Sequence, residues 1–323
     1  ASRLFSIVAD DWAKSKVANR DSTGNRYHDE LRIYVKPKWG AKSIGSITTK
    51  DMTEWVTELI NGTAPTDMKR GKPRPLSPRS IRNIVKVVTA GILQYAVDHR
   101  YVTRNAARDV ETPRIVESED DKVYLNVMEV EALADSAEKP GGHVDAVLIR
   151  FLAYTGTRIN EALALQVRDM RIDEHRARIR RTWTEDSTRG MKLGPPKNGR
   201  ARTIAIPRFL DEDLHALCDG QADGTFVFRA PRGGHIHDHN WRSRRWSHAV
   251  KNAGMEGVKG LRIHSLRHTY ASFAIANGAD VKTLQSQLGH ASAVETLNTY
   301  AAVWPERLGE VADAVDKARS EAI

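Results

Sequence analysis

Residues 264–272 read HSLRHTYAS, and they place two histidines and an arginine at the start of a stretch with helical spacing. His264 and Arg267 are three residues apart, so both side chains would project from one face of a helix start. Three interpretations compete for this cluster: a metal site, a phosphate site, or the charged surface of an ordinary helix. The rest of the chain is needed to decide between them.

The composition is that of a basic globular protein. The chain has 323 residues, of which 40% are hydrophobic, enough for two domains with a core. Lys and Arg total 50 against 41 acidic residues, and the net charge of +9 favours a polyanionic partner. Cys218 is the only cysteine, which excludes an intrachain disulfide and fits a reducing compartment. No apolar run reaches transmembrane length and no signal-peptide pattern is present, so we expect a soluble, cytoplasmic protein without a membrane partner.

Residues 1–111 predict a helical domain, because they show helical periodicity without strand-like alternation. Ser77 and Pro78 form an N-cap and first-position pair that starts one helix. The apolar side chains of this helix keep helical spacing: Ile81, Ile84, Val85, Val88, Ile92 and Tyr95. An earlier helix follows Thr49, and the stretch between the two helices, rich in Gly, Pro and basic residues, predicts an exposed loop.

A proline and an acidic run without periodicity at residues 112–122 predict an interdomain linker. Beyond it, Asn126 and Glu129 form a capping-box pattern, and a later helix ends near Gly156. Three segments predict short strands, the first two around a turn at Asn198-Gly199: residues 176–183, 202–207 and 225–228. Helical spacing returns from residue 238 onward. The second half of the chain is therefore predicted to be α-rich with a small antiparallel sheet.

A metal site has little support in the sequence. His264 and His268 have the i, i+4 spacing of a zinc-binding helix, but Ser265 stands where that motif needs a glutamate. The stretch HIHDH at 235–239 lies in the context of a polar turn and predicts a solvated or DNA-facing loop. No glycine-rich Walker loop occurs, so nucleotide hydrolysis has no support either.

A phosphate site fits the residues better. A phosphodiester in its pentacoordinate transition state carries charge on two non-bridging oxygens. An enzyme without a metal must meet that charge with fixed cations, and bidentate arginines do so best. The reaction also needs a nucleophile and an acid for the leaving oxygen. The helix start at His264 adds a macrodipole that favours an anion.

Four motifs occur in order along the chain. They are YTGTRINEALALQ (154–166), PPKNGRARTIAIP (195–207), HSLRHTYAS (264–272) and LGHASAVETLNTYAAV (288–303). Together they resemble the four boxes of the tyrosine recombinases, the phage integrase family, and the last box is similar to that of integrases from actinobacterial phages. Each box alone is weak evidence, but all four in this order make a strong signal.

The resemblance covers almost the whole chain and implies its fold. Residues 1–111 would form a helical, SAM-like core-binding domain, residues 112–122 the linker, and residues 123–323 an α+β catalytic domain with a C-terminal helix. The expected fold class is therefore mainly α with a small antiparallel β-sheet. The N-terminal arm-binding domain of two-site integrases is expected to be absent from this sequence.

The resemblance also implies a role for each motif residue. Arg158 and Arg267 would grip the scissile phosphate, and His264 and His290 would contact it as well. Tyr300, ten residues after His290, would be the nucleophile. Its attack would give a 3′-phosphotyrosyl bond that conserves the phosphodiester energy, so that religation needs neither ATP nor magnesium.

Two further motif residues would assist the reaction. Lys197, immediately before the Asn-Gly turn of the predicted hairpin, would be the general acid for the 5′-hydroxyl. Glu161, three residues after Arg158 on the same helix turn, would support the site without reacting. His268 would be a structural neighbour of the site rather than a ligand.

Basic side chains other than the six reactive residues are predicted to contact the DNA backbone, where Lys and Arg give salt-dependent affinity with little sequence information. These residues are Arg79, Arg82, Lys86, Arg202, Arg242, Arg244 and Arg245. For Arg202, a surface charge on its strand is an open alternative. Trp241 and Trp246 are predicted to have a packing role.

The segment after Tyr300 predicts a C-terminal helix that starts at Pro305. Its apolar stripe consists of Leu308, Val311, Ala312 and Val315. In the family such a helix often docks on a neighbouring subunit, and packing on its own domain is an equal alternative here.

The function that the resemblance implies is site-specific DNA recombination for phage integration and excision, through a Holliday junction and without a cofactor or metal. The expected partners are double-stranded attachment sites, further copies of the chain in a tetramer on DNA, and accessory DNA-bending proteins or a directionality factor, all in the cytoplasm of a bacterial host. One rival is a strand transferase of the type IB topoisomerase or resolvase kind. Others are a non-catalytic DNA-binding protein on a recombinase scaffold and a metallonuclease, which would lose activity in EDTA.

Overall fold

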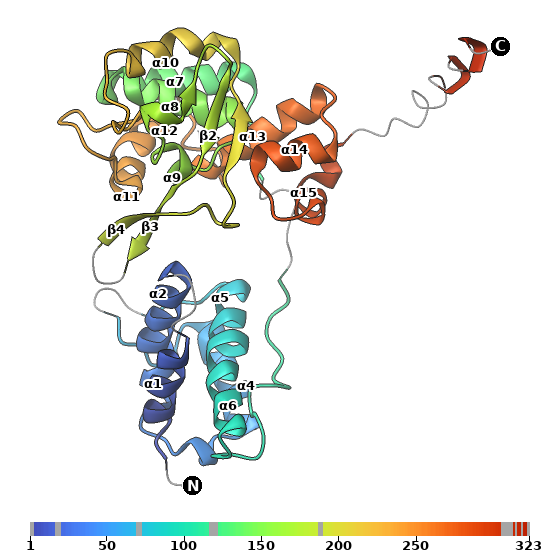
Figure 1. The fold of residues 1–323 in the computed structure, drawn as a ribbon. Coiled ribbons are helices and arrows are strands. Elements are labelled where there is room, and N and C mark those ends of the chain that lie inside the picture. Colours follow the sequence, from blue (N-terminus) through green and yellow to red (C-terminus); the bar gives the residue numbers. More distant parts are fainter. Residues whose placement is uncertain are drawn as a thin grey trace. The chain divides into compact units, whose positions relative to one another are not determined.

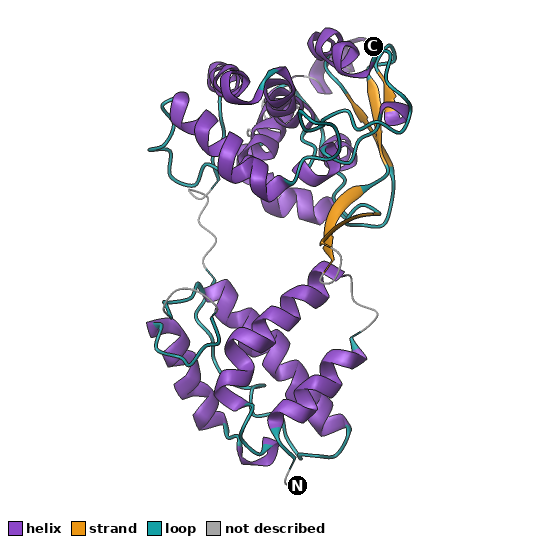
Figure 2. Ribbon diagram, turned by 90° about the vertical axis from the view of Figure 1, so that its left-hand side faces the viewer, coloured by secondary structure: helices purple, strands orange, loops and turns teal. Residues whose placement is uncertain are grey.

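The computed structural model describes residues 3–16, 21–68, 73–115, 122–186 and 190–304, together with residues 313, 315–317 and 319–321. The chain is mainly helical with two small sheets, which confirms the predicted fold class (Figures 1 and 2). It divides into two compact units: residues 1–117 with 185–192, and residues 118–184 with 193–323. Each unit is described by itself below.

The described residues of the segment 1–117 form helices and connecting loops, whereas residues 185–186 and 190–192 of the first unit belong to strands β3 and β4, which are given below. The helices of the segment 1–117 are α1 (Phe5–Ser15), α2 (Asp21–Glu30), η1 (Leu31–Val35), α3 (Lys36–Trp39), η2 (Ile44–Ser46), α4 (Thr49–Asn61), α5 (Pro78–Arg82), η3 (Asn83–Thr89) and α6 (Ala90–Asp98). Residues 21–39 and 78–98 are each continuously helical, with a turn of π-helix inside.

Local sequence signals set the ends of these helices. Ser77 caps α5 by accepting a hydrogen bond from the Ser80 amide, and Pro78 follows at the first helical position, as predicted. Thr48 caps α4 in a capping box with Asp51. The stripe predicted for the helix after Pro78 faces the core: Ile81, Ile84, Val85, Val88 and Ile92 are buried and Tyr95 packs against them. The predicted loop between the two helices falls partly on residues 69–72, outside the described residues.

The elements after residue 122 include both sheets. They are α7 (Val127–Gly141), α8 (His143–Thr155), α9 (Ile159–Ala162), η5 (Val167–Asp169), β1 (Met170–Arg171), β2 (Arg176–Ile179), β3 (Thr182–Asp186), β4 (Gly190–Gly194), β5 (Arg202–Ala205), η6 (Arg208–Leu210), α10 (Asp211–Cys218), α11 (Asp238–Trp241), η7 (Arg242–Trp246), α12 (Ser247–Asn252), α13 (Ile263–Ala276), α14 (Val281–Leu288), α15 (Ala293–Tyr300) and η8 (Ala301–Val303).

Helix α8 is the central helix of the second unit. It is buried along most of its length, and α7 and α13 pack against it. The predicted capping box of Asn126 and Glu129 starts α7. Gly156 ends α8 in the left-handed region at φ +68, also as predicted. A Cβ at this position would lie 2.5 Å from the ring of Tyr270, so the end of α8 and the side of α13 approach too closely for any other residue.

The sheet region differs in part from the prediction. Strands β1, β2 and β5 form an antiparallel sheet in which Ile179 pairs with Arg202. The segment 176–183 is not one strand, because the chain leaves this sheet after Ile179 and enters a separate two-stranded sheet of β3 and β4. The Asn198-Gly199 turn therefore follows β4 and does not directly connect the two predicted strands.

The prediction of a third strand at residues 225–228 was wrong. Phe226 makes only an isolated bridge with Gln166, and the Val227 amide donates to the Leu165 carbonyl. The partner segment turns into the helical η5 directly afterwards, so it offers no extended backbone for a ladder.

Two other expectations concern the C-terminal helix and membrane-spanning segments. Leu308, Val311 and Ala312 of the predicted C-terminal stripe lie outside the described residues, and Val315 is 65% exposed. Among the helices of the described residues, none has the length and apolarity needed to cross a membrane.

We expect Gly156→Ala to lower the free energy of unfolding by about 2 kcal/mol or more, because a left-handed backbone costs about 1 kcal/mol and the added methyl group overlaps Tyr270. Gly220→Ala is the matched control, since Gly220 has φ +71 and nothing within 4 Å of a Cβ. Urea unfolding of both variants measures the difference. Equal losses in the two variants would contradict the close-approach argument.

Candidate active site

Two arginines of the predicted set meet at the C-terminal end of α14. Arg267, on α13, donates from one guanidinium nitrogen to the Leu288 carbonyl at 2.8 Å and from the other to the Gly156 carbonyl at 2.7 Å. Arg158, just before α9, donates to the same Leu288 carbonyl at 3.4 Å. The last carbonyls of a helix lack helical partners and carry partial negative charge, so they stabilise both cations.

A buried carboxylate, Glu161, connects Arg158 to Arg202 of the sheet. Glu161 is 1% exposed and accepts from Arg158 at 3.2 Å. It also accepts two hydrogen bonds from Arg202 of β5, at 3.1 and 2.7 Å. Arg202 donates a further bond from Nε to the Gln287 carbonyl in the last turn of α14. Arg202 is therefore held inside the site, in an ion pair, rather than standing as a lone surface charge on its strand.

Gly289 makes room for this arrangement. It ends α14 in the left-handed region at φ +69, and a Cβ there would lie 2.7 Å from the guanidinium carbon of Arg202. The glycine of the LGH motif is thus required both by the backbone conformation and by the side chain that lies across it.

The charges of the site shift each other's pKa. Burial and the nearby Arg158 lower the pKa of Arg267 to about 9, so its guanidinium is still charged at neutral pH. Burial alone would raise the pKa of Glu161, but the hydrogen bonds from Arg202 and the positive charge of the three arginines lower it. The carboxylate is therefore ionised, and the arrangement is an anion site with an excess of positive charge.

His264 and His290 join this cluster as neutral imidazoles. Desolvation is the larger cause and the positive charge of neighbouring groups, arginines among them, the smaller one, and together they lower the pKa of each histidine to about 4. His264 is nevertheless partly exposed to solvent. His290 is nearly buried, and its Nδ1 lies 2.8 Å from the Thr296 hydroxyl. Neutral imidazoles can donate a hydrogen bond to an anion without adding a buried charge.

Tyr300 lies at the end of α15 and is 1% exposed. Its ring stacks with His290 at 6.3 Å between centroids, and its hydroxyl lies 3.0 Å from Nδ1 of His268. Burial is the largest influence on the Tyr300 hydroxyl and raises its pKa to about 12. The structure thus brings Tyr300 together with the arginines and both histidines. The direct contact with His268 was not predicted from the sequence, although the position of His268 one turn after His264 was a signal for it.

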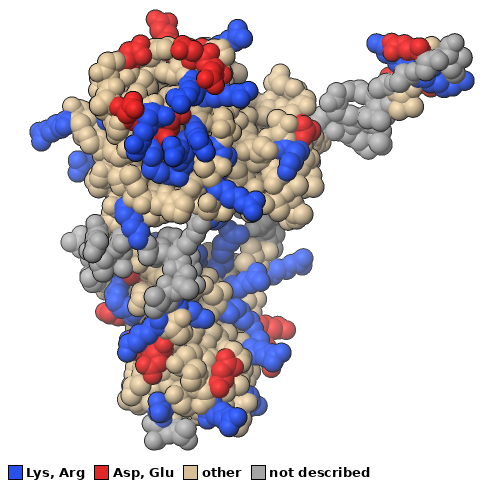
Figure 3. All heavy atoms as spheres, in the orientation of Figure 1, with Lys and Arg blue, Asp and Glu red and all other residues tan. Residues whose placement is uncertain are grey.

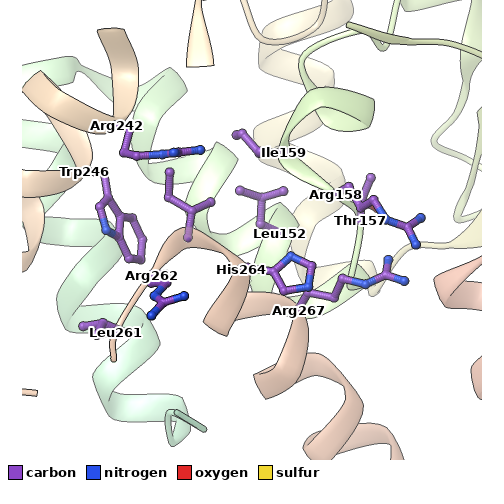
Figure 4. Close-up of a pocket in the computed structure, with 11 residues that line it drawn as sticks. Leu152, Thr157, Arg158, Ile159, Arg242, Trp246, Leu261, Arg262, His264 and Arg267 are labelled. Carbon is purple, nitrogen blue, oxygen red and sulfur yellow. The ribbon is translucent and has the colours of Figure 1, made fainter. Parts of the chain in front are cut away.

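A pocket of about 330 Å³ opens beside the arginine pair (Figure 4). Arg158, His264 and Arg267 line one part of it, and in Figure 4 the two guanidinium groups point to the same side. Arg242 and Trp246 line another part, together with Arg262. Arg262 was not among the predicted site residues, because it lies immediately before α13 and belongs to no recognisable motif.

Lys197 has no direct bond to the other candidates within the described part of the chain. It is exposed in the turn after β4 and, among the described residues, forms no hydrogen bond or ion pair with any of them. The next residue, Asn198, lines a groove that also contains Arg202 and His290. The turn that carries Lys197 is therefore adjacent to the site.

The predicted DNA contacts in the first unit have different surroundings. Arg79 and Arg82 are exposed on α5. Lys86 is half-buried, and its ammonium donates to the carbonyls of Ala107 at 3.2 Å and Arg108 at 2.7 Å. Lys86 therefore holds the chain after α6 to the helix, in addition to any contact it makes with a partner.

Apart from Arg202 on β5, the predicted contacts in the second unit lie on the helix that runs through α11, η7 and α12. Arg242 and Arg244 are exposed, and Arg242 is 3.6 Å from Asp238. Arg245 lies 3.7 Å from the buried Asp145, which accepts a hydrogen bond from the Trp241 indole at 2.7 Å. Trp241 and Trp246 are both buried, in agreement with their predicted packing role.

Charge is unevenly distributed over the second unit. Acidic side chains gather over α10, whose first turn carries Asp211, Glu212 and Asp213 (Figure 3). Lys and Arg side chains gather elsewhere on the same face (Figure 3). Strand β2 contributes to the basic surface, since Arg176 and Arg178 are its exposed residues.

In the histidine-rich stretch 235–239, His235 packs on an aromatic ring, while His237 and His239 are exposed. The His235 ring stacks on Trp183 at 4.3 Å between centroids and lies 4.1 Å from the His237 ring. Within the described part of the chain, no group of three or more His, Cys, Asp or Glu residues is arranged to hold a metal ion.

Comparisons with known proteins assign the chain to a family. Residues 124–307 match the phage integrase family. The chain is 31% identical over 304 residues to tyrosine recombinase XerD of Bifidobacterium longum, covering 90% of this chain and 89% of the relative. It is 28% identical to tyrosine recombinase XerD of Corynebacterium glutamicum, covering 94% and 96%. The chain belongs to the phage integrase family and is a tyrosine recombinase.

Solved structures show the same fold. A Tn1549 transposon integrase in complex with a circular intermediate DNA superposes with a TM-score of 0.73 at 18% identity, covering 98% of this chain and all of that one. A lambda integrase dimer bound to a COC′ core site superposes with a TM-score of 0.64 at 15% identity, covering 93% of this chain and 78% of that one.

We expect Glu161→Gln to lower the free energy of unfolding by about 3 kcal/mol at neutral pH, because it removes the buried carboxylate that pairs with the half-buried Arg158 and Arg202. Asp135→Asn is the control: Asp135 also pairs with an arginine, Arg150 at 2.6 Å, but is 67% exposed, so its loss costs less than about 1 kcal/mol.

The pH dependence supplies a second check on Glu161. Its pKa is lowered in the folded protein, so its contribution is present above the pKa of an unfolded glutamate, about 4.3, and is lost as the pH falls through the folded value. The gap between the wild-type protein and Glu161→Gln should therefore shrink on acidification. A gap that stays constant with pH would contradict an ionised Glu161.

Proposed function

We propose that this protein is a site-specific DNA recombinase that cleaves and rejoins duplex DNA through a 3′-phosphotyrosyl bond to Tyr300. The observation that carries the proposal is the placement of a buried tyrosine hydroxyl beside an anion site built from Arg158 and Arg267. The charges of Arg267 and Tyr300 are close enough to shift each other's pKa. The relatives named tyrosine recombinase and the DNA-bound integrases of the same fold support this function.

In this mechanism the scissile phosphate binds where the two guanidinium groups meet. Arg158 and Arg267 keep N–H groups beyond those that bond the Leu288 and Gly156 carbonyls, and these are available for the non-bridging oxygens. His264 and His290 donate further hydrogen bonds as neutral imidazoles. The cations stabilise the charge that develops on the phosphorane oxygens.

The two bonds change at opposite sides of the phosphorus. The Tyr300 oxygen attacks phosphorus and the 5′-oxygen leaves, taking a proton from Lys197 on the turn after β4. Lys197 is exposed on a turn adjacent to the site, so its ammonium is accessible to the leaving oxygen of a bound duplex. Religation is the reverse reaction, so the phosphodiester energy is retained and no ATP or other cofactor takes part.

The remaining assignments concern the partners. Residues 1–111 bind the duplex as the core-binding domain, 112–122 form the linker, of which 116–121 lie outside the described residues, and 123–323 form the catalytic domain. Exposed arginines of α5 and of the helix containing η7 contact the DNA backbone.

Four copies on DNA exchange strands through a Holliday junction, and the biological reaction is integration and excision of phage DNA in the bacterial cytoplasm, with accessory DNA-bending proteins or a directionality factor. A lambda integrase tetramer bound to a Holliday junction has this fold and supports the assembly (TM-score 0.63, 17% identity).

Covalent trapping tests the proposal. The protein is incubated in EDTA with a pool of nicked duplexes from candidate attachment regions, and a denaturing gel separates protein–DNA adducts. We expect an adduct with the wild-type protein and none with Tyr300→Phe. Tyr270→Phe is the matched control, because Tyr270 packs in the same apolar cluster as Tyr300 and should leave the adduct unchanged.

Each other result has a defined meaning. An adduct with Tyr300→Phe would overturn the choice of nucleophile. An adduct that requires a divalent metal would favour a metallonuclease. Tight, salt-dependent binding without any adduct would favour a non-catalytic DNA-binding protein.

A further inference from the structure

The hydroxyl of Tyr300 has one hydrogen-bond partner among the described residues, the Nδ1 atom of His268 at 3.0 Å. The two rings meet edge to face with centroids 5.6 Å apart. On the other side, the His268 ring contacts the His264 ring at 4.9 Å, again edge to face. His268 is thus in contact both with the predicted nucleophile and with a residue that lines the anion site.

Both partners of this hydrogen bond are neutral, and the hydroxyl proton of Tyr300 has no other acceptor among the described residues. Burial, and to a smaller extent the positive charges of Lys122 and Arg267, lower the pKa of His268 to about 4. The ring is therefore neutral at neutral pH. The pKa of Tyr300 is raised to about 12, so its hydroxyl keeps its proton. The tyrosine therefore donates, Nδ1 of His268 accepts, and the imidazole proton resides on Nε2.

The other charged or polar groups around Tyr300 do not hydrogen-bond to its hydroxyl, among the residues that the structure describes. The charge of Glu295 contributes to the raised Tyr300 pKa, but its carboxylate accepts from the Ala291 amide at 3.0 Å. Arg158 and Arg267 are guanidinium cations with donors only. His290 faces the Tyr300 ring in a near-parallel stack, and its Nδ1 is engaged with Thr296. A buried tyrosine that must lose its proton during attack thus has a single basic atom at its hydroxyl, within the described part of the chain.

His268 is held firmly by the chain that leads into α7. The Tyr124 ring packs against it at 6.3 Å between centroids, and the Leu125 amide donates to the hydroxyl of Thr269 at 2.9 Å. Lys122 donates from its ammonium to the Thr299 carbonyl at 2.6 Å, which fixes the residue before Tyr300. The acceptor and the nucleophile are therefore tied to the same short segment, which keeps their geometry constant.

We propose that His268 is a catalytic residue, the general base that accepts the proton of Tyr300 when the tyrosine attacks DNA. This inference rests on the proposed function. In the step, the Oη–H bond of Tyr300 breaks and the Oη–P bond forms, while the P–O5′ bond breaks. The Tyr300 proton goes to Nδ1 of His268, and the leaving O5′ takes a different proton from Lys197. The bound phosphodiester carries the negative charge that stabilises the resulting imidazolium, and religation returns both protons.

Two variants separate a proton acceptor from a hydrogen-bond acceptor. His268→Asn places an amide oxygen close to the position of Nδ1, so it can hold the hydroxyl but cannot take its proton. His268→Leu removes both capacities. His215→Asn on α10 is the control for the same change at an exposed histidine outside the site. Cleavage is followed as adduct formation on the duplex recovered from the trapping pool, with duplex affinity and thermal unfolding measured in parallel.

We expect both His268 variants to form the adduct about 100-fold more slowly than the wild-type protein at neutral pH, with unchanged duplex affinity. The rate of His268→Asn should rise with pH, because hydroxide replaces the missing base. The wild-type rate should be nearly independent of pH over the same range. The His215→Asn rate should equal that of the wild-type protein.

A sulfur-substituted duplex distinguishes the base from the acid. A duplex with a 5′-bridging phosphorothiolate has a leaving group that needs no proton, so it should restore cleavage to Lys197→Ala but not to His268→Asn. Restoration of His268→Asn by this duplex would overturn the proposal. So would a His268→Asn rate within about threefold of the wild-type rate, since a hydrogen bond alone would then suffice.

Failure of this inference is distinguishable from failure of the proposed function. If the wild-type protein forms no adduct while it binds DNA, the proposed function is overturned and the role of His268 with it. If the wild-type protein forms an adduct that Tyr300→Phe does not, and His268→Asn reacts normally, only the role of His268 is overturned.

Discussion

The carbonyl end of α14 is the point on which the site depends. Arg158 and Arg267 donate to the Leu288 carbonyl, and Arg202 donates to the Gln287 carbonyl. These groups come from the start of α9, from α13 and from β5, so one helix end joins three elements that are far apart in the sequence. Such carbonyls need partners in any buried setting, and here the partners are the cations that an anion would need.

The balance of charge explains why this arrangement suits a phosphate. Three guanidinium groups surround one carboxylate, Glu161, so the cluster keeps an excess of positive charge. Buried charges without counterions are costly, and Glu161 with the helix carbonyls offsets only part of this cost. An incoming phosphodiester completes the neutralisation. The same arginine side chains and Glu161 therefore determine both the stability of the fold and its affinity for an anion.

Much of the fold and most of the candidate site could be predicted from local sequence signals. The caps at Ser77 and Asn126 and the terminating Gly156 act within one or two turns of helix, and the structure has all three. The predictions that failed concerned strands, whose formation depends on a partner segment elsewhere in the chain. The two-stranded sheet of β3 and β4 was missed because its strands pair only with each other and lack a clear apolar alternation. The 225–228 segment looked like a strand but met no extended partner.

The same distinction holds within the site. The motif residues could be selected because their order and spacing are visible in the chain. The ion pair between Arg202 and Glu161 and the contact between His268 and Tyr300 join residues 41 and 32 positions apart, so spacing alone does not reveal them. Arg262 carries no motif, and only the pocket beside the arginine pair shows that it belongs to this region.

The near-complete burial of Arg267 has an entropic consequence. Arginine side chains have many rotamers, and an exposed arginine loses that freedom when it closes on an anion. Arg267 is 2% exposed and is already fixed by hydrogen bonds to two carbonyls. Its rotamer entropy is lost when the chain folds, not when a ligand arrives. The guanidinium of Arg267 is thus held in one orientation before any ligand binds. An anion that fits this orientation binds without the entropy cost of ordering the side chain.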